Sequence, residues 1–415
     1  MSKSAEELYK EREQRINDTI RLKTPDRVPM MFFMQFFPAK YAGITAEEAM
    51  YDYDKLAEVS KKAIVDLAPD MYIDPFFLIP FGNLFEILGD RRFKWPGHGV
   101  PVNSTYQFVE GEHMTAEEYD AFIDDPTDFV LRNHLPRVMT ALEPLRRLPY
   151  LPGRYYLGYE SSVAVFGRPE IAAAMEALLK AGKEGLKMQQ VARAFNQEMT
   201  GLGFPGQFSS VAYAPFDYIG DFFRGTHGIM LDMFRNPDKL HAAMEKIAPA
   251  IIRSVLSSAR NSGVNRCMIP LHKGLDGFMS QEQFKEFYWP GLRALMMELI
   301  DNGVVPFVLW EGDCTSRLDI IKDIPEGKAV YWFERTDIFK AKEVLGNRVC
   351  IKGNVPATLL CTGSPQEVRD YCKKLIDVVG KDGGLIIDGS IGIPDDAKVE
   401  NVETMVEFCR EYGVY

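Results

Sequence analysis

Polar side chains stand directly after most of the short apolar runs in this sequence, at points where a buried strand would give way to a loop. These strand-end positions are Gln35, Asp74, Tyr213, His272, Glu311, Glu334, Lys352 and Asp388. An imidazole titrates near neutral pH, and carboxylates can exchange protons or hold a metal. The pattern predicts a catalytic site built from strand ends, with Glu311, His272 and Asp74 as its catalytic groups.

Four of these side chains have the chemistry of a metal site. Imidazole together with carboxylates suits zinc or another divalent metal, and the predicted ligands are His272, Glu311, Glu334 and Asp388. Glu311 ends the apolar run VVPFVLW, where a carboxylate is costly unless it is paired or coordinated. Two alternatives stay open: His272 could cap the following loop, and Asp74 could cap a helical turn that begins at Pro75.

Aromatic and cationic residues near the same strand ends are candidates for substrate binding. Phe36, Phe37, Tyr213 and Trp310 could form a flat apolar slot for an aromatic substrate, although core packing explains them equally simply. Arg317 and Lys352 could fix an anionic group, or they could form salt bridges between neighbouring elements.

The elements that must position these residues alternate along the chain. A helix is expected within residues 1–26, and from 168 to 415 predicted strands and helices follow each other regularly. With two early strands, the count reaches eight strands, each followed by helix. This predicts a single α/β domain, a (β/α)8 barrel of the TIM type; an open doubly wound sheet is the alternative. Residues 78–160 are irregular and rich in turns, and they are predicted to be an insertion or lid.

Composition excludes several classes of protein. The 415 residues carry a formal net charge of −11, which argues against a nucleic-acid partner. The longest apolar runs fall short of the roughly 18 residues that a membrane span needs. The charged N-terminal segment has no apolar signal core, so a cytoplasmic protein is expected. Six cysteines form neither a CxxC pair nor a dense framework, and free thiols are expected.

Several segments resemble the uroporphyrinogen decarboxylase superfamily. The most specific are IKGNVPATLLCTGSPQEV and GGLIIDGSIGIPDDAKVENVETM in the C-terminal part, at 351–368 and 383–405. Residues 11–29, 37–56 and 272–296 are similar to the same group. The resemblance implies a (β/α)8 barrel, and it implies one of two activities: porphyrinogen decarboxylation, or methyl exchange with a corrinoid protein.

Departures from the family's patterns distinguish between these branches. True decarboxylases carry an early RQAGRY-type loop whose arginines bind substrate carboxylates, whereas residues 34–41 here read MQFFPAKY, with no arginine. Thiol-methylating members hold zinc with an HxCG segment and a late cysteine. Here Leu309 and Glu311 replace that His and Cys, and Ser390 and Ile391 stand where the late cysteine is expected.

The resemblance therefore favours a methyltransferase that moves a methyl group between a small, methoxylated substrate and the cobalamin cobalt of a separate corrinoid protein, with metal assistance. A partner protein is expected because the chain lacks a DxHxxG-type cobalamin motif. Two alternatives remain: a decarboxylase or lyase of a smaller carboxylic acid, anchored by Lys352 or Arg317, and a non-catalytic tetrapyrrole-binding or partner subunit. A homodimer is a further expectation.

Overall fold

The computed structural model describes residues 3–150 and 156–415, and its core is a barrel of eight parallel strands. Six strands form one sheet in the order β11-β10-β9-β8-β7-β6, and β1 pairs with β2. Single parallel bridges, Met30 to Ile387 and Tyr72 to Gly206, join the two sheets into a ring. The strands are β1 (Met31–Phe32), β2 (Met71–Tyr72), β6 (Ser210–Val211), β7 (Arg266–Leu271), β8 (Val305–Trp310), β9 (Val330–Phe333), β10 (Cys350–Lys352) and β11 (Leu385–Ile386). The predicted (β/α)8 fold is confirmed.

Alternation along each strand divides its side chains between the barrel interior and the surrounding helices. Along β8, for example, Phe307 and Leu309 belong to the interior cluster, whereas Val308 and Trp310 belong to the layer between strands and helices. This is the period of two that a pleated strand imposes. Glu311 follows Trp310, so the same alternation points its side chain into the barrel.

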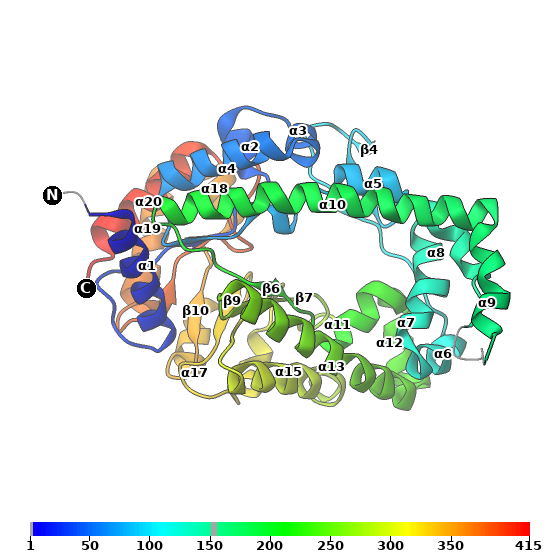
Figure 1. Ribbon diagram of the computed structural model, residues 1–415. Helices are drawn as coiled ribbons and strands as arrows, with labels where there is room; N and C mark the ends of the chain where they lie inside the picture. The colour runs from blue at the N-terminus through cyan, green and yellow to red at the C-terminus, as the bar shows by residue number, and fades with distance from the viewer. Residues whose placement is uncertain (1–2, 151–155) are drawn as a thin grey trace.

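The N-terminal helix α1 (Ala5–Ile20) covers the end of the barrel where the strands begin (Figure 1). Its Ile16 and Ile20 join the interior apolar cluster. The fully buried Asp70, just before β2, accepts hydrogen bonds from Arg15 and Arg27 and so ties α1 to the barrel. With this end closed, the opposite end, where the strands stop, is the open one.

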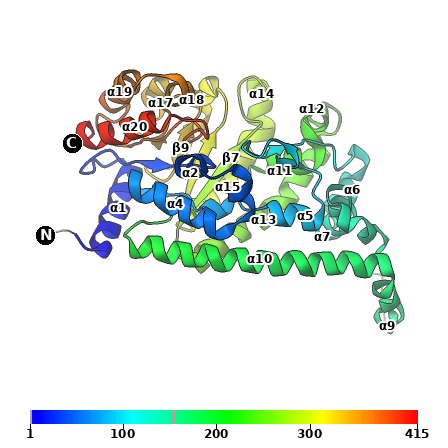
Figure 2. The same ribbon diagram turned by 90° about the horizontal axis from the view of Figure 1, so that it is seen from above.

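Helices surround the barrel, and the views in Figures 1 and 2 show the longest described helix, α10, running along most of the molecule. The main helices of this layer are α4 (Tyr53–Leu67), α10 (Pro169–Gly201), α13 (Pro237–Ser262), α15 (Trp289–Asp301), α17 (Ile338–Leu345), α18 (Ala357–Thr362), α19 (Pro365–Lys374) and α20 (Val399–Tyr412). No helix in residues 3–150 and 156–415 is long and apolar enough to cross a membrane.

Two helical stretches of the chain are interrupted. The stretch that precedes β2 divides into α3 (Ala46–Tyr51) and α4, because Asp52 leaves the helical conformation and caps α4 with its side chain. The stretch that follows β6 divides into α11 (Pro215–Ile219), a π-helical turn (Gly220–Arg224) and α12 (Gly225–Arg235). Gly225 has a φ of 65°, a left-handed value that interrupts a regular helix.

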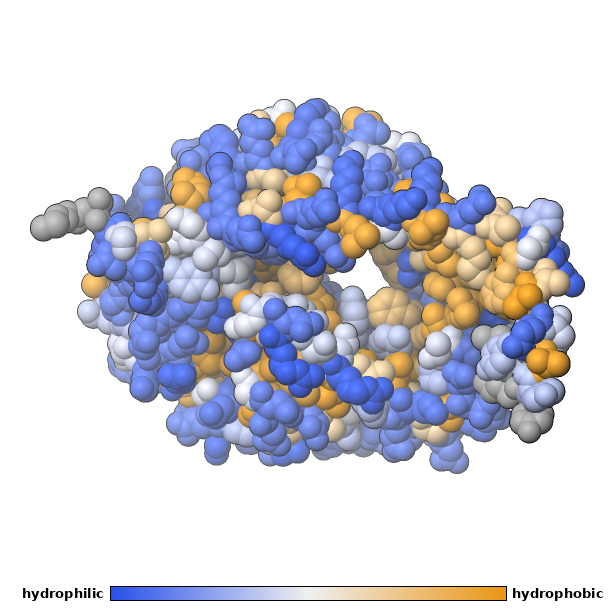
Figure 3. Space-filling model, viewed as in Figure 1, coloured by the Kyte–Doolittle hydropathy of each residue, from blue (hydrophilic) through white to orange (hydrophobic). Residues whose placement is uncertain are grey.

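Residues 78–160, called the insert below, contain short elements that do not follow the alternation of strand and helix in the barrel. The α-helices and strands among them are α5 (Gly82–Leu88), β3 (Phe93–Pro96), β4 (Gly99–Val100), β5 (Gln107–Phe108), α6 (Tyr119–Asp124), α7 (Pro126–Phe129), α8 (Leu135–Val138) and the start of α9 (Gly158–Ser162). Residues 151–155, within the predicted turn-rich stretch, lie outside the described residues. Much of the insert lies at the right of Figure 1, and Figure 3 shows an opening between it and the barrel. Its role as a lid stays a prediction.

Candidate active site

The predicted strand-end residues His272 and Glu311 face each other at the open end of the barrel. His272 follows β7 and Glu311 follows β8, two strands paired along their whole length. His272 Nε2 lies 3.7 Å from Glu311 Oε1, and the two side chains are 35% and 30% exposed. The pair is therefore reachable from solvent while most of its surface is covered.

A buried carboxylate pair that the strand-end pattern did not predict holds His272 in place. Asp221 Oδ2 lies 2.5 Å from His272 Nδ1, and the second oxygen of Asp221 accepts from Lys273 Nζ. Asp217, fully buried, accepts from the backbone N–H groups of His272 and Lys273 and from the hydroxyl of Tyr288 at 2.6 Å. Asp217 and Asp221, which lie in the helical segment after β6, thus fix the loop after β7.

The sequence does contain a signal for these carboxylates. Asp217 and Asp221 are four residues apart, a spacing that places both on one helix face directly after a strand. Asp221 sits in the π-helical turn, a type of turn that often marks functional sites. Lys273 and Tyr288 carry no comparable signal, because their partners come from a different βα unit.

Burial and charge determine which of these groups carry protons. Burial lowers the pKa of His272, but the hydrogen bond and negative charge of Asp221 outweigh it and raise the pKa to about 9. Burial raises the pKa of Glu311 to about 7, against the opposing charge of His272 and with help from Glu334. Burial also raises the pKa of Asp217, to about 6. Near neutral pH the site holds a charged imidazole beside a carboxyl group that is part protonated.

The four predicted metal ligands do not gather around one point. Asp388 is fully buried and forms an ion pair with the fully buried Lys352. Glu334 accepts a hydrogen bond from the backbone N–H of Gly312. In residues 3–150 and 156–415, no group of three or more His, Cys, Asp or Glu side chains is placed to hold a metal ion. The residues present therefore do not fit the predicted zinc site.

The two predicted substrate cations are both engaged inside the protein. Lys352 Nζ lies 3.1 Å from the centre of the Trp332 ring in addition to pairing with Asp388, and burial lowers the pKa of Lys352 to about 8. Arg317 is 1% exposed, and its guanidinium contacts Asp276 and the carbonyl of Met279. Both residues therefore form salt bridges between neighbouring elements, which was the alternative to binding a substrate anion.

The predicted aromatic slot is not assembled either. Trp310 and Phe37 are fully buried in the layer between strands and helices, as the core-packing alternative expects. Phe36 is 5% exposed and packs edge-on against Tyr106. Tyr213 alone lies beside the candidate site, with its ring centre 6.4 Å from that of His272.

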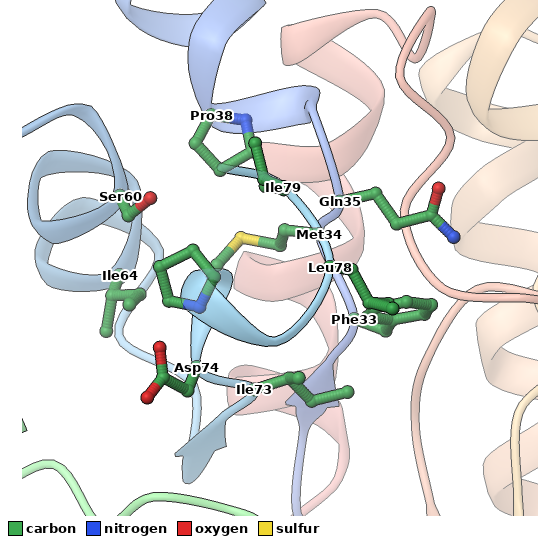
Figure 4. A pocket seen from close by; sticks show the side chains of 11 residues that line it. Phe33, Met34, Gln35, Pro38, Ser60, Ile64, Ile73, Asp74, Leu78 and Ile79 are labelled. Carbon is green, nitrogen blue, oxygen red and sulfur yellow. The ribbon is translucent and has the colours of Figure 1, made fainter. Parts of the chain in front are cut away.

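Asp74 lies at a separate place on the open end, beside a small cavity between the ends of β1 and β2 and helix α4 (Figure 4). It caps the turn that starts at Pro75, and it accepts from Phe76 N and from Asn196 Nδ2 at 2.6 Å. Burial raises the pKa of Asp74. The cavity measures about 20 Å³, room for about one water molecule. Gln35, the strand-end residue of β1, points away from Asp74 in Figure 4.

Comparison with known proteins agrees with this geometry. The family model for uroporphyrinogen decarboxylase (URO-D) matches residues 160–412, which include β6 to β11 and the residues around His272 and Glu311. The chain belongs to the uroporphyrinogen decarboxylase family. The match starts at residue 160, the last residue of the insert, so it also leaves out β1 and β2 of the barrel.

Individual relatives of this URO-D family member are distant. Uroporphyrinogen decarboxylase from Chlorobium phaeovibrioides is 27% identical over 187 residues, which cover 43% of this chain and 51% of the relative. The corresponding protein from a Nitratiruptor species is 27% identical over 180 residues. The chain thus spans about half the length of the curated relatives it matches. A solved methyltransferase from Methanosarcina mazei superposes with a TM-score of 0.62 and 15% identity, over 97% of this chain and 98% of that one, which shows a shared fold.

Proposed function

We propose that this URO-D family protein transfers a methyl group from the oxygen of a small methoxylated substrate to the cobalt of a separate corrinoid protein. The observation that carries the proposal is the pair at the barrel mouth, in which His272, held by Asp221, lies 3.7 Å from Glu311. A barrel mouth built to deliver a proton suits a reaction whose leaving group is an oxygen anion.

The proton balance explains why such a pair is needed. When the bond between the methyl carbon and oxygen breaks, the electron pair stays on oxygen, which leaves as an alkoxide or phenoxide unless it is protonated. The corrinoid would supply the nucleophile that takes the methyl carbon. Glu311, whose pKa burial raises to about 7, would donate the proton, and the charged His272 would stabilise the carboxylate that Glu311 leaves behind.

The charges at the mouth argue against a polycarboxylate substrate such as a porphyrinogen. The loop after β1 has no arginine, and Lys352 and Arg317 are buried in ion pairs. The two cations beside the pair, His272 and Lys273, are both engaged by Asp221, so neither is a free clamp for a substrate carboxylate.

The opening visible in Figure 3, bordered by α10, the insert and α12, supports access by a partner protein. A corrinoid carried on another protein must approach the strand ends from outside the barrel. The superposition with a methyltransferase over nearly the whole chain is consistent with this use of the fold.

A panel of methyl donors tests the proposal. The purified protein is mixed with cob(I)alamin and with a methoxylated aromatic compound, a methylamine or a thioether, and the absorbance of cobalt is followed. We expect methylation of the corrinoid with the methoxylated donor, and loss of it in His272→Asn. A panel in which the wild-type protein gives no methylation would refute the proposal.

Decarboxylation is the second candidate, because the curated relatives that the chain matches are decarboxylases. It predicts CO2 release from a small carboxylic acid without any corrinoid. Lys352 and Arg317, its predicted anchors, would have to leave their buried ion pairs to bind such a substrate. The third alternative, a non-catalytic tetrapyrrole-binding subunit, predicts tight porphyrin binding that survives both Glu311→Ala and His272→Ala.

A further inference from the structure

The insert contacts the candidate active site through a short seam of backbone and side-chain hydrogen bonds. The backbone N–H groups of His113 and Met114 both donate to the carbonyl of Phe223, at 2.7 and 2.8 Å. Arg224 donates to the carbonyl of Met114 and pairs with Glu112. Phe223 and Arg224 lie in the π-helical turn that also carries Asp221, so the turn touches the insert on one side and His272 on the other.

The two backbones approach closely along this seam. Gly225 has a φ of 65°, and a Cβ atom there would lie 3.2 Å from the carbonyl oxygen of Gly111. A side chain at Gly225 would therefore be strained by its own backbone and crowded by the insert. The glycine allows the insert to lie directly on the π-helical turn.

Glu110 extends this seam toward the active site. It accepts hydrogen bonds from the backbone N–H of Thr226, at 2.6 Å, and from the hydroxyl of the same residue. Glu110 Oε1 also lies 3.9 Å from Lys273 Nζ, whose closer partner is Asp221. The buried Lys273 side chain fills the space beside Gly220, where a Cβ atom would come within 2.9 Å of Lys273 Cε.

We propose that Glu110 is a positioning residue of the active site: from the insert it holds the Lys273 ammonium, which in turn fixes the Asp221 carboxylate that orients His272. The chain of contacts runs from Glu110 Oε1 to Lys273 Nζ, then to Asp221, and ends at His272 Nδ1. The insert thereby contributes to the reaction without contacting the reacting atoms. The effect on rate rests on the proposed function, whereas the effect on His272 does not.

The charges around His272 give the direction of the effect. Asp221, Asp217 and Glu311 all face the imidazole and favour its charged form, and Tyr213 is the aromatic neighbour. Without the Glu110 charge, the Lys273 ammonium would lie wholly on Asp221 and weaken the hold of that carboxylate on His272. We therefore expect the imidazole ring to be less firmly oriented, which changes the surroundings of its two nitrogens.

The experiment compares two substitutions on the same seam, Glu110→Gln and Glu112→Gln. Both remove one negative charge and keep a hydrogen-bond acceptor, but Glu112 pairs with Arg224 and does not contact Lys273. The ring nitrogens of His272 are followed by NMR in the full-length protein. The sequence has six histidines, so the His272 signals can be assigned by their loss in His272→Asn.

We expect Glu110→Gln to shift the His272 nitrogen signals and to lower kcat about two- to five-fold with an unchanged KM, because a partly exposed ion pair has a modest effect. Glu112→Gln should leave the His272 signals where they are. Identical His272 signals and kcat in Glu110→Gln and wild-type protein would overturn the inference, as would equal shifts in both variants. Because the NMR signals need no substrate, a wild-type protein inactive with every donor would refute the proposed function, while the shift in Glu110→Gln would still support the role of Glu110.

Discussion

Histidines in two regions of this molecule have opposite surroundings. At the barrel mouth, His272 lies between the carboxylates of Asp221 and Glu311. In the insert, His113 and His134 pack against each other with ring centres 5.8 Å apart, and His134 packs against Phe223. Within the described chain, His134 Nδ1 and His113 Nε2 have no hydrogen-bond partner.

The surroundings set opposite charge states for the same side chain. Asp221 raises the pKa of His272 to about 9 despite burial, whereas burial lowers the pKa of His134 to about 3, and the charges of Arg92 and Arg137 act in the same direction. The barrel mouth therefore keeps His272 protonated, whereas burial in the insert favours the neutral forms of His113 and His134. These surroundings, and not the residue type, distinguish the candidate catalytic His272 from the structural His134.

The largest expected effect comes from removing the proton at the mouth. In Glu311→Gln the side chain keeps its shape but cannot donate a proton, and we expect methyl transfer to fall about 10²- to 10⁴-fold. Glu118→Gln, which removes a charge from the insert where Glu118 pairs with Arg137, serves as the matched control and should stay near the wild-type rate. Equal rates in the two variants would mean that the mouth is not the reactive region.

Strand ends were the part of this site that the sequence could predict. His272, Glu311 and Glu334 follow apolar runs, and parallel strands bring such positions to one end of a barrel. Alternation also accounts for Trp310: its neighbours Leu309 and Glu311 point inward, so Trp310 must pack outward against the helices. The eight strands and most helices follow from the same two periodicities.

Pairing between distant segments could not be predicted in this way. Lys352 and Asp388 both end up inside the barrel, where neither can reach water, and each becomes the other's partner. Their residue types suggested a substrate anchor and a metal ligand, but only the three-dimensional packing shows that they neutralise each other. The same holds for Lys273 and Tyr288, whose partners Asp221 and Asp217 come from another βα unit.

The next largest effect concerns the stability of the insert in acid. In the unfolded chain His134 has an ordinary pKa near 6.5, and in the folded protein its pKa is about 3. The unfolded state therefore binds the proton more readily, and stability is lost as pH falls from 6.5 toward 3. The loss attributable to His134 should be about 3 kcal/mol at pH 4.

Urea unfolding at pH 7 and pH 4 measures this loss. His134→Phe keeps a ring against Phe223 but cannot be protonated. In this variant the difference in the free energy of unfolding between pH 7 and pH 4 should shrink by most of that amount. His241→Phe is the control, because His241 also stacks on a phenylalanine, Phe287, but lies in α13 outside the insert. If the free energy of unfolding of His134→Phe depended on pH as in the wild-type protein, His134 would not be the source of the acid sensitivity.

The smallest expected effect is the pH dependence of the reaction at the mouth. Since burial raises the pKa of Glu311 to about 7, its donor form is lost as pH rises through neutrality, while His272, with a pKa of about 9, stays charged. The rate of methyl transfer to cob(I)alamin should fall about five-fold between pH 7 and pH 8 in wild-type protein. The weak residual activity of Glu311→Gln should lack this decline, which separates it from any effect of pH on the corrinoid. In His134→Phe the decline should persist unchanged, because burial already keeps His134 neutral over this range. A flat wild-type profile between pH 6.5 and pH 8 would instead place the proton donor on a group other than Glu311.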